Sequence, residues 1–210
     1  MLSRRLMQVS KMIKKNAKVL DVGTDHAYLP IYLKKNKLCK NVCASDVSQN
    51  ALDIAKKNLI KYDMDINLYL SDGLDNIKED YDTITLCGMG TSTIVKILED
   101  KKLPDNIIVS SNNDLVKLRK YMNSIGYKIT DEKVIYENKK YYDIISYEKG
   151  EEKLSYKEVL LGKSDDKKYY KYLYEKEKVI FSKCRLGQKL KKIKKLLILK
   201  KYSTEKKKDC

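Results

Sequence analysis

Long apolar runs are missing from this sequence of 210 residues. No run approaches the roughly 20 residues that a membrane-spanning helix needs, so we expect no membrane span. The first segment, MLSRRLMQVSKMIKK, is basic but lacks the continuous apolar stretch and the small-residue cleavage site of a secretory signal. It predicts an amphipathic helix instead, and we expect the chain in the cytoplasm.

Histidine and cysteine are scarce. The sequence has one histidine, His26, and five irregularly spaced cysteines. An odd number of cysteines without a regular spacing argues against a disulfide framework. Cys39 and Cys43 lack a second Cys or His pair that would close a tetrahedral metal site. We therefore expect reduced thiols and no metal ion.

Charged residues, by contrast, are abundant and unevenly placed. The chain is 42% hydrophobic and 35% charged, with a net charge of +16, which is typical of a globular protein rather than a disordered one. Residues 151–210 hold 20 Lys and Arg against 9 Asp and Glu, a net charge of +11, whereas residues 1–150 carry +5. A localised basic surface is typical of a protein that binds nucleic acid. A general lysine bias is the alternative, but it does not explain the segregation.

Apolar runs and helical periodicity alternate through the first 150 residues. The periodicity predicts helices over residues 3–15, 27–37, 49–62, 91–99 and 114–126. Short apolar runs predict strands over residues 18–23, 41–47, 66–70, 82–87, 106–111, 129–136 and 141–147. This alternation is typical of a parallel sheet covered on both faces, and the last two strands, joined by a short polar turn, predict an antiparallel closing strand. We therefore expect an α/β fold with a Rossmann-like sheet over residues 1–150.

The pattern changes after Gly150. Residues 155–182 and 185–201 predict two long amphipathic helices with a break at or just before Gly187. An amphipathic helix needs a partner for its apolar stripe, so we expect a coiled-coil-like helical hairpin as a second domain, residues 151–210, with a frayed end. We expect a monomer, and a stabilising or dimerising role for the hairpin is the alternative to RNA contact.

A glycine turn follows the first strand, at Asp21-Val22-Gly23-Thr24. Glycine lets the backbone pass close to a ligand, and open α/β sheets bind ligands at this carboxyl edge. The second and third glycines of the dinucleotide motif G-x-G-x-x-G are absent, which argues against NAD and favours a ligand without a pyrophosphate. Asp21 and Gly23 therefore belong to the predicted cofactor site.

Acidic residues also end the next two strands. Asp46, followed by Val47, lies about 20 residues beyond the glycine turn, where a carboxylate accepts hydrogen bonds from ribose hydroxyls; Ser48 is the better candidate for the helix cap. Asp72 would accept a hydrogen bond from an adenine amino group, and Gly73 leaves room for the ring. Carboxylates at several strand ends would repel phosphates but suit a sulfonium, an amine and a ribose. They predict S-adenosyl-L-methionine as the cofactor.

The fourth strand ends in Cys87-Gly88-Met89-Gly90, a tight loop that we expect beside the cofactor. Gly88 and Met89 are predicted to contact it, and a plain turn with Met89 in the core is the alternative. No base adjoins Cys87 in the pattern, so we do not expect a nucleophilic thiol. His26 is better placed to contact the cofactor.

The run DVGTDHAYLPIYL, residues 21–33, with SDV, SDGL, CGMG and a late YYDII, resembles the bacterial tRNA (adenine(22)-N1)-methyltransferase family. The resemblance covers nearly the whole chain, and its most specific part is DHAYLP, residues 25–30. It implies a class I S-adenosylmethionine-dependent methyltransferase. Three segments depart from the family pattern. Thr91 follows Gly90 where the family has GMGG, Ser110-Ser111-Asn112 replaces QPN, and Gln49-Asn50-Ala51 follows SDV where the family has Gly-Pro-Leu.

The resemblance implies methyl transfer to N1 of an adenine in tRNA, at position 22. N1 lies on the Watson–Crick edge, so the base must be unpaired and presented outward. Asp25 would stabilise the positive charge that develops on the ring, or would only hold the cofactor amine or the loop. Asn112 would orient the base through its amide, and Tyr28 would stack on it. The basic tail and the basic N-terminal helix would bind the tRNA backbone.

Two other functions stay open at the level of sequence. One is a methyltransferase that acts on a protein or a small molecule and uses the tail for assembly. The other is a non-catalytic RNA-binding module on a degenerate Rossmann-like domain, which the altered GMGG and QPN segments would fit.

Overall fold

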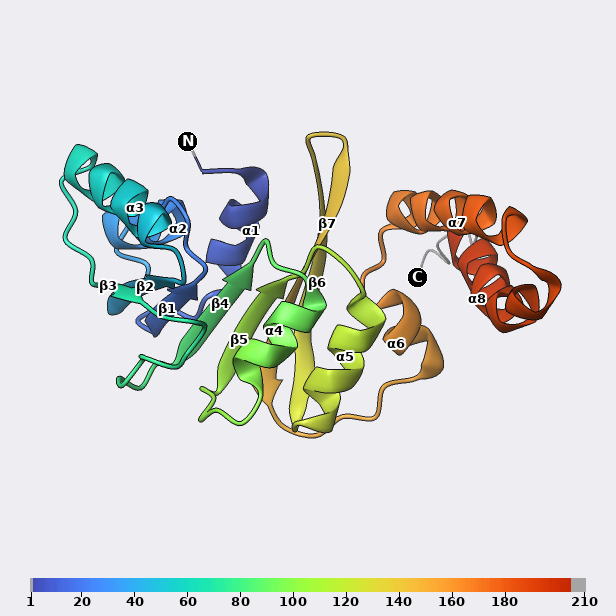
Figure 1. Cartoon of the computed structure of the whole chain (residues 1–210). Coiled ribbons are helices and arrows are strands. Elements are labelled where there is room, and N and C mark those ends of the chain that lie inside the picture. Colours follow the sequence, from blue (N-terminus) through green and yellow to red (C-terminus); the bar gives the residue numbers. More distant parts are fainter. Residues whose placement is uncertain (1, 205–210) are drawn as a thin grey trace, which may run out of the picture. The chain divides into compact units, whose positions relative to one another are not determined.

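Seven strands form one mixed sheet in the computed structural model, which describes residues 2–204 (Figure 1). The strands are β1 (Lys18–Val22), β2 (Asn41–Asp46), β3 (Leu68–Leu70), β4 (Thr83–Cys87), β5 (Asn106–Ser110), β6 (Tyr127–Glu137) and β7 (Lys140–Lys149). They lie in the order β3-β2-β1-β4-β5-β7-β6. Neighbours from β3 to β5 are parallel, and β7 is antiparallel to both β5 and β6. The predicted mixed sheet with an antiparallel closing strand is confirmed.

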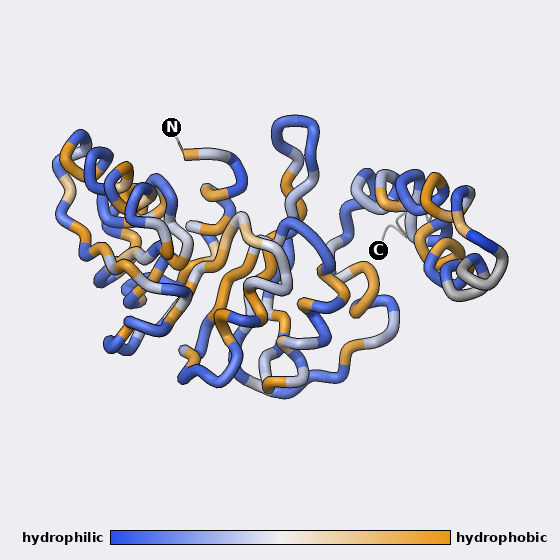
Figure 2. The backbone as a smooth tube through the Cα atoms, in the orientation of Figure 1, coloured by the Kyte–Doolittle hydropathy of each residue, from blue (hydrophilic) through white to orange (hydrophobic). Residues whose placement is uncertain are grey.

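Five helices cover the two faces of this sheet. α1 (Arg4–Met12), α2 (Tyr28–Lys35) and α3 (Gln49–Lys61) cover one face, and α4 (Thr91–Leu98) and α5 (Leu115–Ser124) cover the other (Figure 1). Each helix lies within its predicted range. Alternate residues of a strand point to opposite faces, and Val19, Val42 and Ile108 accordingly belong to the core cluster that includes α1, α2 and α3. The tube coloured by hydropathy shows apolar stretches along the central strands (Figure 2).

The ligand-binding edge of the sheet is fixed by its topology. Strand order reverses between β1 and β4, because β2 continues from β1 on one side and β5 continues from β4 on the other. Open α/β sheets bind ligands outside the carboxyl ends of the strands at such a switch point. We call the loops that follow β1, β2, β4 and β5 at this edge the rim.

β6 and β7 form a long hairpin that overhangs the rim. Its turn, Asn138-Lys139, has both residues at positive φ, 50° and 62°, the geometry that matches the twist of a two-residue hairpin. The β6–β7 pairing continues to Glu137↔Lys140, whereas the β5–β7 pairing ends at Val109↔Ile145. The outer part of the hairpin therefore extends past the carboxyl end of β5, as Figure 1 shows.

The chain divides into two compact units, with the boundary between Glu152 and Lys153. The second unit contains α6 (Tyr156–Leu161), α7 (Lys167–Ser182) and α8 (Leu186–Thr204). α7 and α8 pack together, and Glu177 of α7 pairs with Lys192 and Lys195 of α8 at 3.2 and 2.8 Å. The end of the predicted second domain, residues 205–210, lies outside the described residues.

One sequence prediction about this unit is wrong. A single helix was expected over residues 155–182, but α6 ends at Gly162, whose φ of 79° is left-handed and unfavourable for a helix. Asp166 then starts α7 anew, because its side chain accepts a hydrogen bond from the Tyr169 N–H. The second break falls just before Gly187, as predicted. No helix among the described residues is long and apolar enough to cross a bilayer.

Candidate functional site

Asp21 lies beneath the rim, buried at the end of β1. Its Oδ2 accepts a hydrogen bond from the Thr24 hydroxyl at 2.7 Å, and its Oδ1 accepts one from the Thr85 hydroxyl at 2.6 Å. Burial, and to a smaller extent the charge of Asp46, raises the pKa of Asp21 to about 6, although the two threonine hydrogen bonds and Arg5 oppose the rise. Asp21 therefore joins the end of β1 both to the turn that follows it, through Thr24, and to the neighbouring strand β4, through Thr85.

Gly23 brings the first rim loop against the fourth-strand loop. It has a φ of +71°, and a β-carbon there would lie 3.2 Å from Cε of Met89. The Gly23 N–H also donates to the Ser45 carbonyl at the end of β2, at 2.9 Å. Three strand ends thus meet at this turn, and glycine is needed because an L side chain disfavours this backbone conformation.

Asp25, His26 and Tyr28 form a cluster on the first rim loop. Asp25 has a φ of +52°, and its N–H donates to Asp46 Oδ2 at 3.0 Å. Its carboxylate lies 2.8 Å from Nδ1 of His26, and its side chain is 67% exposed. The His26 and Tyr28 rings are 5.3 Å apart, and Asn58 of α3 donates to the His26 carbonyl. The loop thus presents an accessible carboxylate beside two rings.

Asp46 joins the first two rim loops. One of its oxygens accepts from the Asp25 N–H and the other accepts from the Ser48 N–H, each at 3.0 Å. Ser48 caps α3 through its hydroxyl, as predicted. Val47 is 67% exposed at the same edge. The carbonyl of Asp46 accepts from Ser71, which brings the end of β3 alongside.

Asp72 and Gly73 follow β3 and turn toward α4. Lys96 of α4 pairs with Asp72 Oδ2 at 3.0 Å, with both side chains exposed. Gly73 has a φ of +59°, and a β-carbon there would lie 2.8 Å from Cγ1 of Ile97. The structure therefore places Asp72 at the predicted edge, with one carboxylate oxygen engaged by a lysine.

Asn112 supports the loop that ends β4. Its N–H donates to the Met89 carbonyl at 2.9 Å, and its amide nitrogen donates to the Gly88 carbonyl. Burial raises the pKa of the neighbouring Cys87 thiol to about 12, so the thiol is protonated at neutral pH and is a poor nucleophile. Asn112 and Met89, predicted from separate segments, thus lie together.

Two of the departures from the family pattern contact one another. The Thr91 hydroxyl lies 2.9 Å from the Ser111 hydroxyl, and it also donates to the Asn113 carbonyl at 2.7 Å. The Thr91 N–H donates to the Asn113 side chain. Thr91 and Ser111 are both buried. The changed residues therefore bind each other and keep the β4 and β5 loops joined.

Arg5 lies beside the rim, at a position that the sequence did not predict. It comes from α1, and its guanidinium lies over the Tyr142 ring of β7, 5.0 Å from the centroid. A β-carbon at Gly88 would lie 3.9 Å from Nη1 of Arg5. Only the fold brings α1, and with it Arg5, to the rim.

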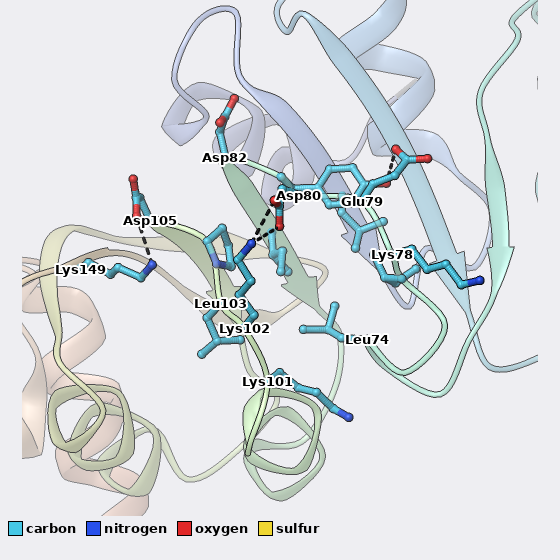
Figure 3. Close-up of a pocket in the computed structure, with 15 residues that line it drawn as sticks. Leu74, Lys78, Glu79, Asp80, Asp82, Lys101, Lys102, Leu103, Asp105 and Lys149 are labelled. Atoms are coloured by element: carbon cyan, nitrogen blue, oxygen red, sulfur yellow. Dashed lines mark hydrogen bonds and ion pairs between the residues drawn. The ribbon is translucent and has the colours of Figure 1, made fainter.

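A separate hollow of 490 Å³ lies at the opposite edge of the sheet (Figure 3). Asp82 and Asp105, which line it, precede β4 and β5, so it adjoins the amino ends of these strands. Two of its lysines are paired locally, Lys102 with Asp80 at 2.8 Å and Lys149 with Asp105 at 3.2 Å. None of the predicted site residues lines this hollow, and we place the functional site at the rim. Residues 2–204 contain no group of three or more His, Cys, Asp or Glu that could hold a metal ion.

Known proteins resemble this chain over most of its length. A family model described as "Methyltransferase domain" matches residues 2–145. The tRNA (adenine(22)-N(1))-methyltransferase of Bacillus subtilis (strain 168) is 31% identical over 168 residues, which cover 77% of this chain and 71% of that protein.

Two solved structures extend the likeness to the second unit. TrmK of M. capricolum, in complex with S-adenosyl-homocysteine, is 33% identical with a TM-score of 0.85 and covers 97% of this chain and 98% of its own. A putative tRNA (m1A22) methyltransferase of Streptococcus pneumoniae is 28% identical with a TM-score of 0.89 and covers 97% of this chain and 100% of its own. The helices that follow the sheet are therefore part of the shared fold.

Proposed function

We propose, because the chain belongs to the family of tRNA (adenine(22)-N(1))-methyltransferases, that it transfers a methyl group from S-adenosylmethionine to N1 of adenine 22 in tRNA. The observation that supports this proposal is the position of the rim, where loops from four strands meet at the switch point of a methyltransferase sheet. The chain acts in the cytoplasm as a monomer.

The rim chemistry fits a cationic methyl donor. The Asp46 charge helps to raise the pKa of Asp21, so negative charge is concentrated at this edge. A sulfonium and an amine would relieve this repulsion, whereas a phosphate would increase it. Asp46 would accept from the ribose hydroxyls, and Asp72 with Gly73 would receive the adenine.

The remaining cofactor contacts would come from the two glycine loops. Gly23 and Gly88 would let the cofactor approach the backbone, and His26, Val47 and Met89 would contact it beside them. The bound cofactor supplies an activated methyl group, so the protein must mainly orient the reactants and stabilise charge.

The target base would lie above the first rim loop. Asp25 is exposed there, and its charge would stabilise the cation that forms when adenine N1 is methylated. The amide nitrogen of Asn112 is engaged with Gly88, which leaves its oxygen to accept a hydrogen bond from the adenine amine. The Tyr28 ring, 45% exposed, offers a face on which the base would stack.

The basic second unit would hold the tRNA. Residues 153–210 carry 20 Lys and Arg against 7 Asp and Glu. Such a surface binds the phosphate backbone without reading bases, and the shape of the RNA would supply selectivity.

A methylation assay with two transcripts tests the function. Wild-type protein should transfer labelled methyl groups to an unmodified tRNA with adenine at position 22, and not to the same tRNA with guanine there. Mass spectrometry of the digested product should find 1-methyladenosine. Absence of transfer, or methylation elsewhere, would contradict the proposal.

The role of Asp25 has its own test. Asp25→Asn keeps the size of the side chain but removes its charge, so kcat should fall about 100-fold, in the range typical of one electrostatic group. The Kd for S-adenosylmethionine should stay within about threefold, because the Asp25 N–H that binds Asp46 is retained. An unchanged kcat would remove Asp25 from catalysis, and a greatly raised Kd with little change in kcat would assign it to cofactor binding.

A further inference from the structure

Helix α1 is held against the overhanging hairpin by its first turn. The Ser3 hydroxyl caps the helix by accepting from the Leu6 N–H. The Arg4 N–H donates to Glu137 Oε1 at 2.7 Å, and the Arg4 guanidinium donates to the Tyr136 carbonyl at 3.4 Å. These contacts join residues that are more than 130 positions apart in the chain. The first turn of α1 is therefore fixed beside the rim.

This attachment directs Arg5 toward the ends of β1 and β4. Its Nη1 lies at van der Waals distance from the place that a β-carbon of Gly88 would occupy. The positive charge of Arg5 also opposes the burial-driven rise in the pKa of both Asp21 and Cys87, which lie near the carboxyl ends of these two strands. The guanidinium thus lies at the switch point itself, on the side that faces the hairpin.

Arg5 makes no ion pair with a carboxylate among residues 2–204. Other cations near the sheet are neutralised locally: Arg119 by Glu132, and Lys96 by Asp72. Arg5 instead lies against the Tyr142 ring, which attracts the cation through its face and leaves the edge of the guanidinium to bind another group. A half-buried arginine held in this way is preorganised for an oxyanion with two oxygens in one plane.

The proposed cofactor carries one such group. Its sulfonium, amine and ribose match the rim carboxylates, but its α-carboxylate would be repelled by them and needs a cation. We propose that Arg5, oriented by Tyr142, binds the α-carboxylate of S-adenosylmethionine and so fixes the methionine end of the methyl donor between the β1 and β4 loops. This inference rests on the proposed function.

Calorimetry with two cofactors tests the assignment. S-Adenosylmethionine and decarboxylated S-adenosylmethionine differ only in the carboxylate, so wild-type protein should bind the former about 10- to 100-fold more tightly, as expected for one bidentate charged contact. Arg5→Ala should abolish that preference: its Kd for S-adenosylmethionine should rise by the same factor, while its Kd for the decarboxylated compound should stay within about threefold. Arg5→Lys keeps the positive charge but loses the paired N–H donors of the guanidinium, so its preference for S-adenosylmethionine should lie between those of wild type and Arg5→Ala.

Matched controls separate this contact from a general loss of charge or fold. Lys11→Ala removes one exposed positive charge from the same helix, and it should leave both Kd values unchanged. An unchanged Kd for the decarboxylated compound in Arg5→Ala is itself proof of an intact pocket. Equal preference for S-adenosylmethionine in wild type and Arg5→Ala would overturn the inference and leave the proposed function standing. Failure of wild type to bind either compound would instead refute the proposed function.

A phosphate of the RNA is the competing oxyanion. If Arg5 bound a phosphate, Arg5→Ala would keep the cofactor preference, weaken tRNA binding, and reduce the slope of log Kd against log salt concentration by about 1. We expect the slope for Arg5→Ala to equal that of wild type in the absence of cofactor. A reduced slope with unaltered cofactor preference would overturn the assignment to the carboxylate.

Discussion

Asp21 shows how a single buried carboxyl group couples the rim to pH. Its pKa in the folded chain, about 6, lies above the 3.8 of an ordinary aspartate. The folded state therefore favours the protonated form, and the stability that this contributes is complete below pH 3.8 and is lost as pH rises through 6. The difference amounts to about 3 kcal/mol at neutral pH.

Asp21→Asn should remove this pH dependence. The amide cannot ionise, so the free energy of unfolding of the variant relative to wild type should rise by up to about 3 kcal/mol between pH 4 and pH 7.5. Urea unfolding across this range measures it. Asp53→Asn, at an exposed carboxylate of α3, is the control and should give the same small difference at every pH. A flat profile for Asp21→Asn would show that the carboxyl group ionises normally in the folded protein.

Alanine substitutions at Gly73 and Gly126 distinguish the cost of backbone strain from the cost of steric overlap. Both have positive φ, +59° and +77°, but a β-carbon at Gly73 would lie 2.8 Å from Ile97, whereas one at Gly126 would meet nothing within 4 Å. Gly126→Ala should cost about 1 kcal/mol from the backbone alone. Gly73→Ala should cost about 1–3 kcal/mol more, since the branched Ile97 side chain has to move. Equal losses in chemical denaturation would contradict the steric argument.

The sequence indicated proximity where the signal was local. Gly23, Asp46 and Asn112 each lie at or just after the end of a strand, and the strand ends of a parallel sheet share one edge, so their proximity follows from topology. Their roles at the site stay predictions. Arg5 could not be placed in this way, because its position depends on contacts between α1 and a hairpin more than 130 residues away. The pairing of Thr91 with Ser111 was equally invisible in the sequence, because it depends on how two separate loops meet.

The connection between α5 and the closing hairpin is a buried ion pair. Arg119 of α5 binds Glu132 of β6 at 2.5 Å, and Asp143 of β7 lies 3.9 Å from the same guanidinium. All three side chains are almost fully buried. Removing one partner of such a pair leaves a buried charge uncompensated, which is more costly than the net value of the pair.

Glu132→Gln should therefore destabilise the first unit by about 3–5 kcal/mol. Lys102→Met is a suitable control, because the Lys102–Asp80 pair is exposed and its removal should cost less than about 1 kcal/mol. Thermal or urea unfolding compares the two variants. A cost below about 1 kcal/mol for Glu132→Gln would mean that the remaining carboxylate, Asp143, compensates Arg119 by itself.

Elements with a strong hydrophobic period were predicted well, and their ends less so. All five helices of the first unit fell within the predicted ranges, whereas β6 and β7 are longer than their apolar runs, by two residues each at the end away from the rim and by one residue each at the turn. The break at Gly162 was missed since apolar periodicity on both sides suggested one helix. What ends α6 is a backbone conformation, φ of 79°, which periodicity does not report.

At the scale of the molecule, structure and charge are divided between the two units. The sheet and its core cluster lie wholly within residues 2–152. Most of the excess positive charge lies beyond Glu152. Cofactor binding and RNA binding should therefore be separable.

A fragment of residues 1–152 should bind S-adenosylmethionine with the Kd of the full chain but should bind tRNA at least about tenfold more weakly at 150 mM salt. The full chain should also show the steeper dependence of tRNA affinity on salt, with a log–log slope of about −0.7 to −0.9 for each phosphate that a cation of the protein neutralises. Fluorescence anisotropy between 50 and 200 mM salt measures both. Equal slopes for the two proteins would exclude the second unit from RNA contact, and unchanged affinity would favour an assembly role.

The contacts between the first turn of α1 and the β6–β7 hairpin have a consequence for synthesis on the ribosome. Arg4 and Arg5 are translated more than 130 residues before Glu137 and Tyr142, which contact them. The nascent chain therefore cannot complete its methyl-donor pocket stepwise. That pocket can bind the methyl donor only late in synthesis, after the hairpin has left the exit tunnel and has packed against α1.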